Sequence, residues 1–190
     1  MKASLAVILP CLLPWPAEAT PTDRKPAPAV SSSLTEEHWN ASRTLSLRTP
    51  ATWEVRSEAG QPEMTEARGD GLILRLVRRG GELGLDSFHA ECMLLRLAGA
   101  MDASPQVDYE YDFVGAQIGD RKTLDSAFVV HYDQAIDGHR DWRQRNLTVV
   151  GGGESVCVVA YAPLPVWKKS KPARTLLGSV VESVRFGPWH

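Results

Sequence analysis

The feature that most constrains the fold is a run of β-strand patterns between residues 107 and 161, interrupted only by turn residues. Adjacent strands joined by very short turns must be antiparallel. Asp137-Gly138 is the clearest of these turns, because both residues tolerate the positive φ angles that a two-residue hairpin requires. The pattern predicts an antiparallel meander with strands over residues 107–118, 124–136, 139–150 and 155–161.

The last strand of this run is apolar on both of its faces, at Val156, Val158 and Ala160 and at the intervening Cys157, Val159 and Tyr161. Such a strand is expected to be buried on both sides. Earlier in the chain, Leu45 and Leu47 alternate with polar residues and predict a half-buried strand over residues 45–48. A second apolar segment predicts another strand over residues 72–77.

Two helices are expected beside these strands. Asp86 is a candidate N-cap for a helix whose apolar residues follow a three-to-four spacing, at Leu85, Phe88, Cys92, Leu95 and Gly99. A second helix is expected from Val166 to Phe186, with Leu176, Leu177, Val180, Val181 and Val184 on one face. Grouped strands with two helices favour an α+β fold in which helices cover an antiparallel sheet.

The N-terminal residues have the organisation of a secretory signal peptide. Lys2 precedes an apolar stretch that is too short to span a bilayer, and Ala17-Glu18-Ala19 is a small-x-small cleavage site. Pro10 stands before Cys11, where a lipoprotein would carry a small residue, so we expect cleavage without lipid anchoring. We therefore expect a signal peptide over residues 1–19, a Pro/Ser-rich leader over 20–36, and one exported domain over 37–190, placed in the periplasm or outside the cell.

The charge balance and hydropathy exclude two classes of partner. The chain carries 21 basic and 23 acidic residues, for a formal net charge of −2. Nucleic-acid binding requires a clustered basic surface, so we expect no nucleic-acid partner. Residues 149–166 are apolar, but glycines, Glu154 and two prolines interrupt them, so no transmembrane span is expected.

Two cysteines remain in the mature chain. In an oxidising compartment Cys92 and Cys157 can form a disulfide. Alternatively they are two separate buried thiols, because free cysteine is among the most buried residue types. The sequence leaves both possibilities open. Their apolar surroundings argue against either one as a catalytic nucleophile, since burial raises the pKa of a thiol.

The Asp137-Gly138 hairpin carries the residues that most resemble a metal or catalytic site, His131, Asp133, His139 and Asp141. Continuous pairing from the turn places His131 opposite Gln144, Phe128 opposite Leu147 and Tyr132 opposite Arg143. The two histidines then lie five residue pairs apart along the strands, on opposite faces, at about 3.3 Å per residue. We therefore expect an ordinary solvated hairpin, with no metal, cofactor or catalytic residue assigned.

Two other motifs have simpler explanations than chemistry. Gly151-Gly152-Gly153 leads into an apolar strand, whereas a phosphate-binding loop leads into a helix. Ser155 lacks the flanking glycines of a hydrolase elbow, so we expect a glycine hairpin turn. The basic run from Lys168 to Lys171 is expected to be a solvated face of the last helix.

Three segments resemble the PsbP-like fold family, which includes an extrinsic photosystem subunit, the Ran-binding Mog protein, DcrB-type envelope proteins and Eag-type chaperones. They are Leu-Ser-Leu-Arg-Thr-Pro-Ala-Thr-Trp over residues 45–53, the strand over 72–77 leading to the Asp86 helix, and Gly-Ser-Val-Val-Glu-Ser-Val-Arg-Phe over 178–186. The resemblance implies a curved antiparallel sheet between helices, usually without catalytic residues, in proteins that commonly bind other proteins. The signal peptide separates this chain from the cytoplasmic Eag-type chaperones.

Two functions follow as expectations. The first is an exported, non-enzymatic accessory protein that binds another protein, with Trp142, Trp167 and Trp189 as candidate exposed anchors unless the core buries them. The second is a small exported hydrolase or metal-binding protein that uses the region from His131 to His139. Convergence of that region's histidines and aspartates in one pocket would favour the second.

Overall fold

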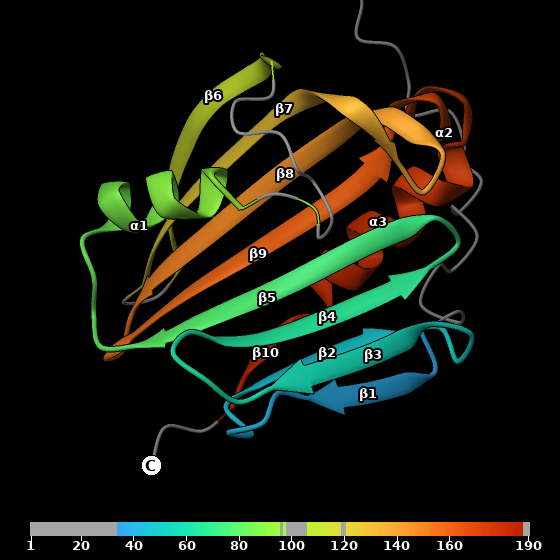
Figure 1. The fold of residues 1–190 in the computed structure, drawn as a ribbon. Coiled ribbons are helices and arrows are strands. Elements are labelled where there is room, and N and C mark those ends of the chain that lie inside the picture. The colour runs from blue at the N-terminus through green and yellow to red at the C-terminus, as the bar shows by residue number, and fades with distance from the viewer. Residues whose placement is uncertain (1–33, 96, 98–105, 119–120, 188–190) are drawn as a thin grey trace, which may run out of the picture.

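The computed structural model describes residues 34–95, 97, 106–118 and 121–187, with the backbone alone over 109–118 (Figure 1). The predicted signal peptide, most of the leader and Trp189 lie outside these residues. The elements are β1 (Glu36–Trp39), β2 (Leu45–Thr49), β3 (Glu54–Glu58), β4 (Glu63–Gly69), β5 (Leu72–Gly80), α1 (Leu85–Met93), β6 (Gln106–Ile118), β7 (Arg121–Ile136), β8 (His139–Gly151), β9 (Glu154–Pro163), α2 (Leu164–Lys169), α3 (Lys171–Glu182) and β10 (Arg185–Phe186).

Within the described residues the strands form two open antiparallel sheets. The seven-stranded sheet has the order β3-β4-β5-β9-β8-β7-β6, and the three-stranded sheet has the order β1-β2-β10. The predicted meander from β6 to β9 is confirmed, and its last strand pairs back onto β5. Every residue of β9 is buried, as its double apolar pattern predicts.

Residues with positive φ angles form the hairpin turns. Asp137 and Gly138 have φ angles of 50° and 79°, as a two-residue turn of the primed type requires. Gly152 and Gly153, at 65° and 78°, make the corresponding turn between β8 and β9. The glycine run is therefore a hairpin turn, as predicted.

Helices cover opposite faces of the large sheet, which gives the α+β architecture that the sequence predicts. Figure 1 shows α1 in front of the sheet on the side of β7 and β8, and α3 behind the sheet. Phe88 and Cys92 of α1 pack into one core with Tyr161. Leu177 and Val180 of α3 pack into a second core on the other face. Alternate residues of β9 therefore supply both cores.

The helix α1 is shorter than the apolar spacing predicts. It ends at Met93, not near Gly99, and its N-cap is Gly84, not Asp86, which lies in the first turn. Apolar spacing does not locate the end of a helix, because segments that follow it also bury apolar residues. Leu97 shows this, since it is buried beyond the end of the helix.

The single C-terminal helix expected from Val166 to Phe186 is wrong. The chain forms α2 and α3, followed by the short strand β10. Pro172 lies in the first turn of α3, and Ser170 caps this helix by accepting a hydrogen bond from the backbone N–H of Ala173. A proline lacks the N–H that would continue α2 and is tolerated only at the start of a helix.

Besides β10, the strands β1 and β4 are additional to those predicted, whereas β3 contains Val55, which with Trp53 continues the alternation of Leu45 and Leu47. Charged or polar residues dominate β1 and β4, so neither shows the apolar alternation of a half-buried strand. β1 begins at Glu36, the last residue of the leader expected over 20–36, and Leu34 already lies in the core.

Candidate functional site

The hairpin of β7 and β8 has a different register from the one predicted. Ile136 pairs with His139 at the turn, but an irregularity follows, and His131 then pairs with Asp141, not Gln144. Four residues of β7 and only one of β8 lie between these two pairs. The cross-strand pairs predicted for Phe128 and Tyr132 are therefore also wrong, because Gln144 is the partner of Phe128.

His131 lies between two carboxylates on neighbouring strands. Its Nδ1 is 2.9 Å from Asp141 of β8, and its Nε2 is 3.1 Å from Asp108 of β6. A neutral imidazole has one N–H donor, whereas the imidazolium donates from both nitrogens. The hydrogen bond to Asp141, and secondarily that to Asp108, raises the pKa of His131. The cluster is a surface ion pair across three strands.

The structure does not bring the second histidine into this cluster. The His139 ring lies edge-on to Trp142, with ring centroids 6.0 Å apart, and its backbone carbonyl accepts a hydrogen bond from the Trp142 indole. Asp133 is exposed on β7. Among the residues that the structure describes, no three His, Cys, Asp or Glu side chains are arranged to hold a metal ion.

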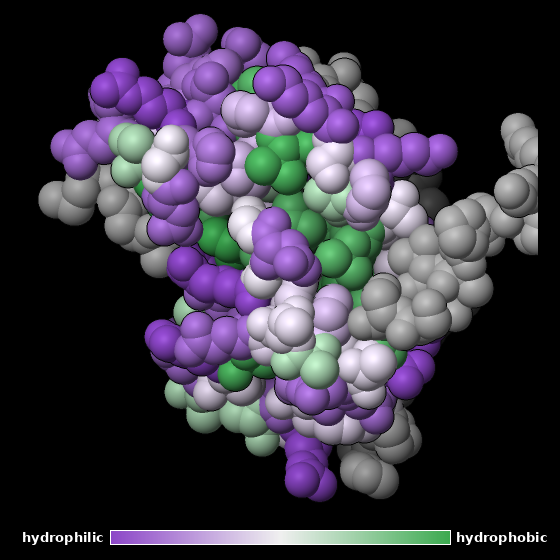
Figure 2. Space-filling view, turned by 90° about the vertical axis from the view of Figure 1, so that its right-hand side faces the viewer, coloured by the Kyte–Doolittle hydropathy of each residue, from purple (hydrophilic) through white to green (hydrophobic). Residues whose placement is uncertain are grey.

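Two of the cavities formed by the described residues offer candidate binding surfaces, and His131 lines neither of them. The first, the strand-end hollow, has a volume of about 280 Å³ and lies where the tip of the β7–β8 hairpin meets α2 and the β4–β5 turn. Figure 2 views this end of the molecule and shows apolar side chains gathered in the middle of the face among hydrophilic ones. Its walls include Ile73, Trp142 and Val166, with Arg68 and Asp137 at its edge.

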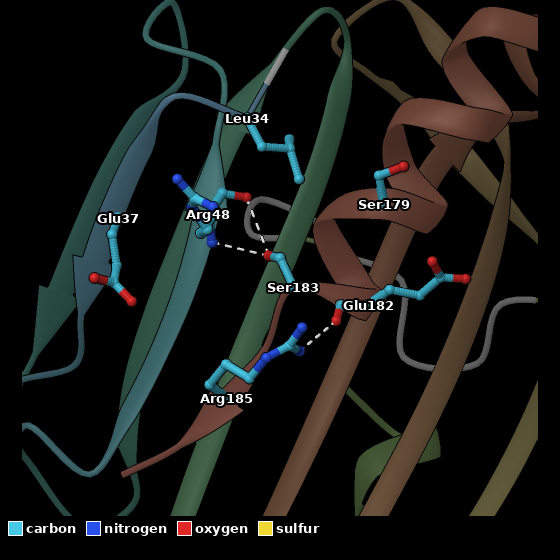
Figure 3. Close-up of a pocket in the computed structure, with 7 residues that line it drawn as sticks. All are labelled: Leu34, Glu37, Arg48, Ser179, Glu182, Ser183 and Arg185. Carbon is cyan, nitrogen blue, oxygen red and sulfur yellow. Dashed lines mark hydrogen bonds between the residues drawn. The ribbon is translucent and has the colours of Figure 1, made fainter. Parts of the chain in front are cut away.

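The second cavity, the helix–strand groove, is larger at about 620 Å³. It lies between α3 and the small sheet (Figure 3), and its lining residues are Leu34, Glu37, Arg48, Ser179, Glu182, Ser183 and Arg185.

Ser183 holds the two sides of the groove together. Its hydroxyl accepts a 2.8 Å hydrogen bond from the backbone N–H of Arg48 and lies within donating distance of the carbonyls of Arg48 and Val180. The C-terminal end of α3 is thereby attached to β2. The two bonds between Ser183 and Arg48 are visible at the centre of Figure 3. Because Ser183 is buried and satisfied within the protein, its role in the groove is structural.

The charged groups of the groove are paired unequally. Glu37 accepts a 3.1 Å hydrogen bond from Ser46, and Arg185 donates to the backbone carbonyls of Glu182 and Val184. Figure 3 shows the Glu182 carboxylate directed away from Arg48. The ion pairs of the described residues involve neither Arg48 nor Arg185.

Trp39 presents an exposed aromatic surface on the same side of β1 as the groove. It is 41% exposed, and it lies two residues after Glu37, so both side chains project from one face of the strand. Of the tryptophans considered as exposed anchors, Trp142 is only 1% exposed. Trp167 is half-buried beneath the guanidinium of Arg143, at 4.1 Å from its ring centre.

His89 is a buried polar residue that the sequence reasoning missed. It lies on α1, and its ring nitrogens contact the hydroxyls of Thr148 at 2.7 Å and Ser126 at 3.0 Å. Burial lowers the pKa of His89, against the opposing influence of Asp125 and Asp86. Its position three residues before Cys92, on the predicted apolar stripe, was the signal that could have placed it inside.

The remaining motifs have structural roles. The Ser155 hydroxyl donates to the carbonyl of Gly81 and accepts from the backbone N–H of Leu83. Lys168, Lys169 and Lys171 are exposed, but they span the junction of α2 and α3 and do not form one helical face. Among the described residues, no helix combines the length and apolar character required to cross a membrane.

The fold places this chain in a known structural class. No family model and no curated protein sequence matches it significantly. Its architecture is the PsbP-like fold, as its similarity to solved structures shows.

The cyanobacterial PsbP protein (CyanoP) of Synechocystis sp. PCC 6803 is similar over 81% of this chain and 93% of its own, with a TM-score of 0.57 and 8% identity. The Ran-binding protein Mog1p of Saccharomyces cerevisiae is similar over 81% of this chain and 96% of its own, with a TM-score of 0.50 and 11% identity. A Bacteroides thetaiotaomicron protein matches over 82% of this chain but only 49% of its own, with a TM-score of 0.51 and 10% identity.

Proposed function

We propose that this chain is an exported accessory protein that binds a partner protein, and that the partner places an acidic segment in the helix–strand groove. The observation that carries the proposal is the exposed guanidinium of Arg48, which forms no ion pair in the described part of the chain and lies at the edge of a concave surface. Arginine binds carboxylates through two parallel hydrogen bonds, which gives it geometric specificity.

The exposed Trp39 supports a protein as the occupant. Tryptophan and arginine are the residues most enriched where binding energy concentrates in protein interfaces. Trp39 and the groove together offer an aromatic anchor near the exposed guanidinium of Arg48. The shared fold with a Ran-binding protein is consistent with a binding role, although it shows the architecture alone.

Crosslinking tests the proposed surface. The chain is expressed in its native host, crosslinked mildly and recovered from the envelope fraction, in parallel with the variants Arg48→Glu/Arg185→Glu and Trp39→Ala. We expect both variants to lose a partner that the unchanged chain retains. Lys168→Glu and Leu94→Ala are the matched controls, because both residues are exposed outside the groove lining and should leave recovery unchanged.

Two outcomes contradict the proposal. One is equal recovery of the partner by the groove variants and the controls. The other is repeated recovery of no partner by the unchanged chain. Thermal unfolding of each variant shows that any loss of binding does not come from unfolding.

Export is the second part of the proposal and is tested separately. The support is the signal-peptide pattern over residues 1–19. We expect the protein from fractionated cells to begin near Thr20 and to lie outside the cytoplasm. N-terminal sequencing measures this, and a cytoplasmic protein that retains Lys2 would contradict it.

The hydrolase alternative receives less support from the geometry. Asp141 and Asp108 do approach His131, but His139 lies apart against Trp142. Neither the strand-end hollow nor the helix–strand groove is lined by His131. Catalysis would require the histidines and aspartates of this hairpin to converge in a pocket that can hold a substrate.

A further inference from the structure

The two cysteines of the mature chain meet beneath α1. Cys92 lies on the buried side of the helix and Cys157 lies in β9, and they are 1% and 0% exposed. Both are free thiols in this structure, and Cys92 is, after burial, among the groups that raise the pKa of Cys157, so the two side chains lie near each other. Both belong to the same apolar core, on the α1 face of the sheet.

An independent contact fixes this placement of the helix. His89 on α1 hydrogen-bonds Thr148 at 2.7 Å, and Thr148 pairs directly with Cys157 across β8 and β9. Cys92 follows His89 by three residues and therefore projects from the same side of the helix. The hydrogen bond that positions His89 over β8 therefore directs Cys92 toward Cys157.

We propose that Cys92 and Cys157 form a disulfide that joins α1 to β9 when the chain folds in an oxidising compartment. A disulfide requires the two Cα atoms to lie within about 7 Å of each other, and both cysteines belong to the one core that α1 forms with β9. Export determines whether the bond forms in the cell, because cytosolic thiols stay reduced. The chemistry of the bond itself is independent of any binding partner.

The reaction is thiol–disulfide exchange with a small-molecule disulfide. One cysteine thiolate attacks the disulfide, forms a mixed disulfide and releases one small thiol. The second cysteine thiolate attacks the protein sulfur of the mixed disulfide and releases the second small thiol. Two S–H bonds of the protein are lost and one S–S bond is formed, while the small disulfide is reduced to two thiols.

The bond should form during folding, before α1 packs onto the sheet. Burial, followed by the contact with Cys92, raises the pKa of Cys157, so the folded protein holds little of the attacking thiolate. Neither sulfur is accessible to a small disulfide once the helix is in place.

Refolding tests the proposal directly. The full chain with Cys11→Ser is denatured, reduced and refolded in a buffer of oxidised and reduced glutathione, then denatured again and alkylated. We expect the two free thiols to disappear and the mass to fall by two hydrogen atoms. Peptide mapping should join the segments that contain Cys92 and Cys157. The same chain refolded with reductant alone should be alkylated at both cysteines.

Cys92→Ser and Cys157→Ser, made in the same background, are the matched controls and cannot form the internal bond. Circular dichroism confirms that each sample has folded. The proposal is overturned if a folded chain retains both alkylatable thiols in the oxidising buffer. It is equally overturned if the cysteines carry only glutathione, or if they join separate chains on a non-reducing gel.

Discussion

Acidification should destabilise the protein through the buried His89. Its side chain is 1% exposed, and desolvation lowers its pKa in the folded state, with Asp125 and Asp86 opposing this only in part. An unfolded histidine titrates near pH 6.5 (roughly the model-peptide value). Between that pH and the lower folded pKa, the unfolded chain binds a proton that the folded chain does not. Stability is therefore fully present above about pH 6.5 and falls as the pH decreases.

The expected changes in the free energy of unfolding come from one bound proton and from the two hydroxyl groups that contact the ring. A difference of one bound proton gives a slope of at most about 1.4 kcal/mol per pH unit in the free energy of unfolding. At pH 7.5, roughly one unit above the pKa of an unfolded histidine, this proton contribution is absent. The effect of His89→Leu at that pH comes from losing the ring that contacts Ser126 and Thr148. Both hydroxyls are buried and lose this partner, so we expect a cost of about 2 kcal/mol.

Urea unfolding across a pH series from about 7.5 to 5.5, which brackets the titration of unfolded histidine, measures both effects. The unchanged chain should lose stability as the pH falls, and His89→Leu should show a flatter profile. The double variant His89→Leu/Ser126→Ala should recover part of the cost at pH 7.5, since removing both polar partners is nearly neutral. A stability difference between the unchanged chain and His89→Leu that stays constant across the series would refute the reasoning.

Four further predictions concern other parts of the fold. His131, with its raised pKa, contributes stability that is present below about pH 6.5 and is lost as the pH rises through its folded pKa, so His131→Gln should remove this term in the same titrations. A Cβ at Gly69 would overlap the indole of Trp53, so Gly69→Ala should cost about 1–3 kcal/mol in thermal unfolding. By contrast, Gly178→Ala in α3 meets open space and should stabilise by roughly 0.5–1 kcal/mol. The Asn40 side-chain oxygen accepts two backbone N–H groups of the following turn, so Asn40→Ala should cost about 2 kcal/mol in urea unfolding.

The meander from β6 to β9 was predictable because its signals are local, whereas β4 of the same sheet shows no apolar alternation. Alternation of apolar residues and paired turn residues are enough to place the meander, and Asp137 and Gly138 have the positive φ angles expected of them. The register was not predictable beyond the turn. An irregularity between His131 and Ile136 shifts the register of every pair farther from the turn. The apolar alternation of the sequence gives no sign of this irregularity.

The groove was not predictable, because its residues act through distant contacts. Ser183 and Arg48 are separated by most of the chain, and both have ordinary surroundings in the sequence. The sequence does not mark Trp39 as an anchor, because β1 has no apolar alternation that would predict a strand there. Trp142, one of the three candidate anchors, is buried, which is the alternative that the sequence left open.

The two proposals concern opposite faces of the sheet, and β9 separates them. Its odd-numbered residues, including Cys157 and Tyr161, face the core under α1, whereas Val158 and Ala160 face the core under α3. A disulfide to α1 therefore restrains the face that lies away from the groove. Removing the disulfide should lower the stability of the whole domain, because β9 belongs to both cores. It should leave partner affinity unchanged in the folded protein, because Ser183 and β2 hold the groove on the other side.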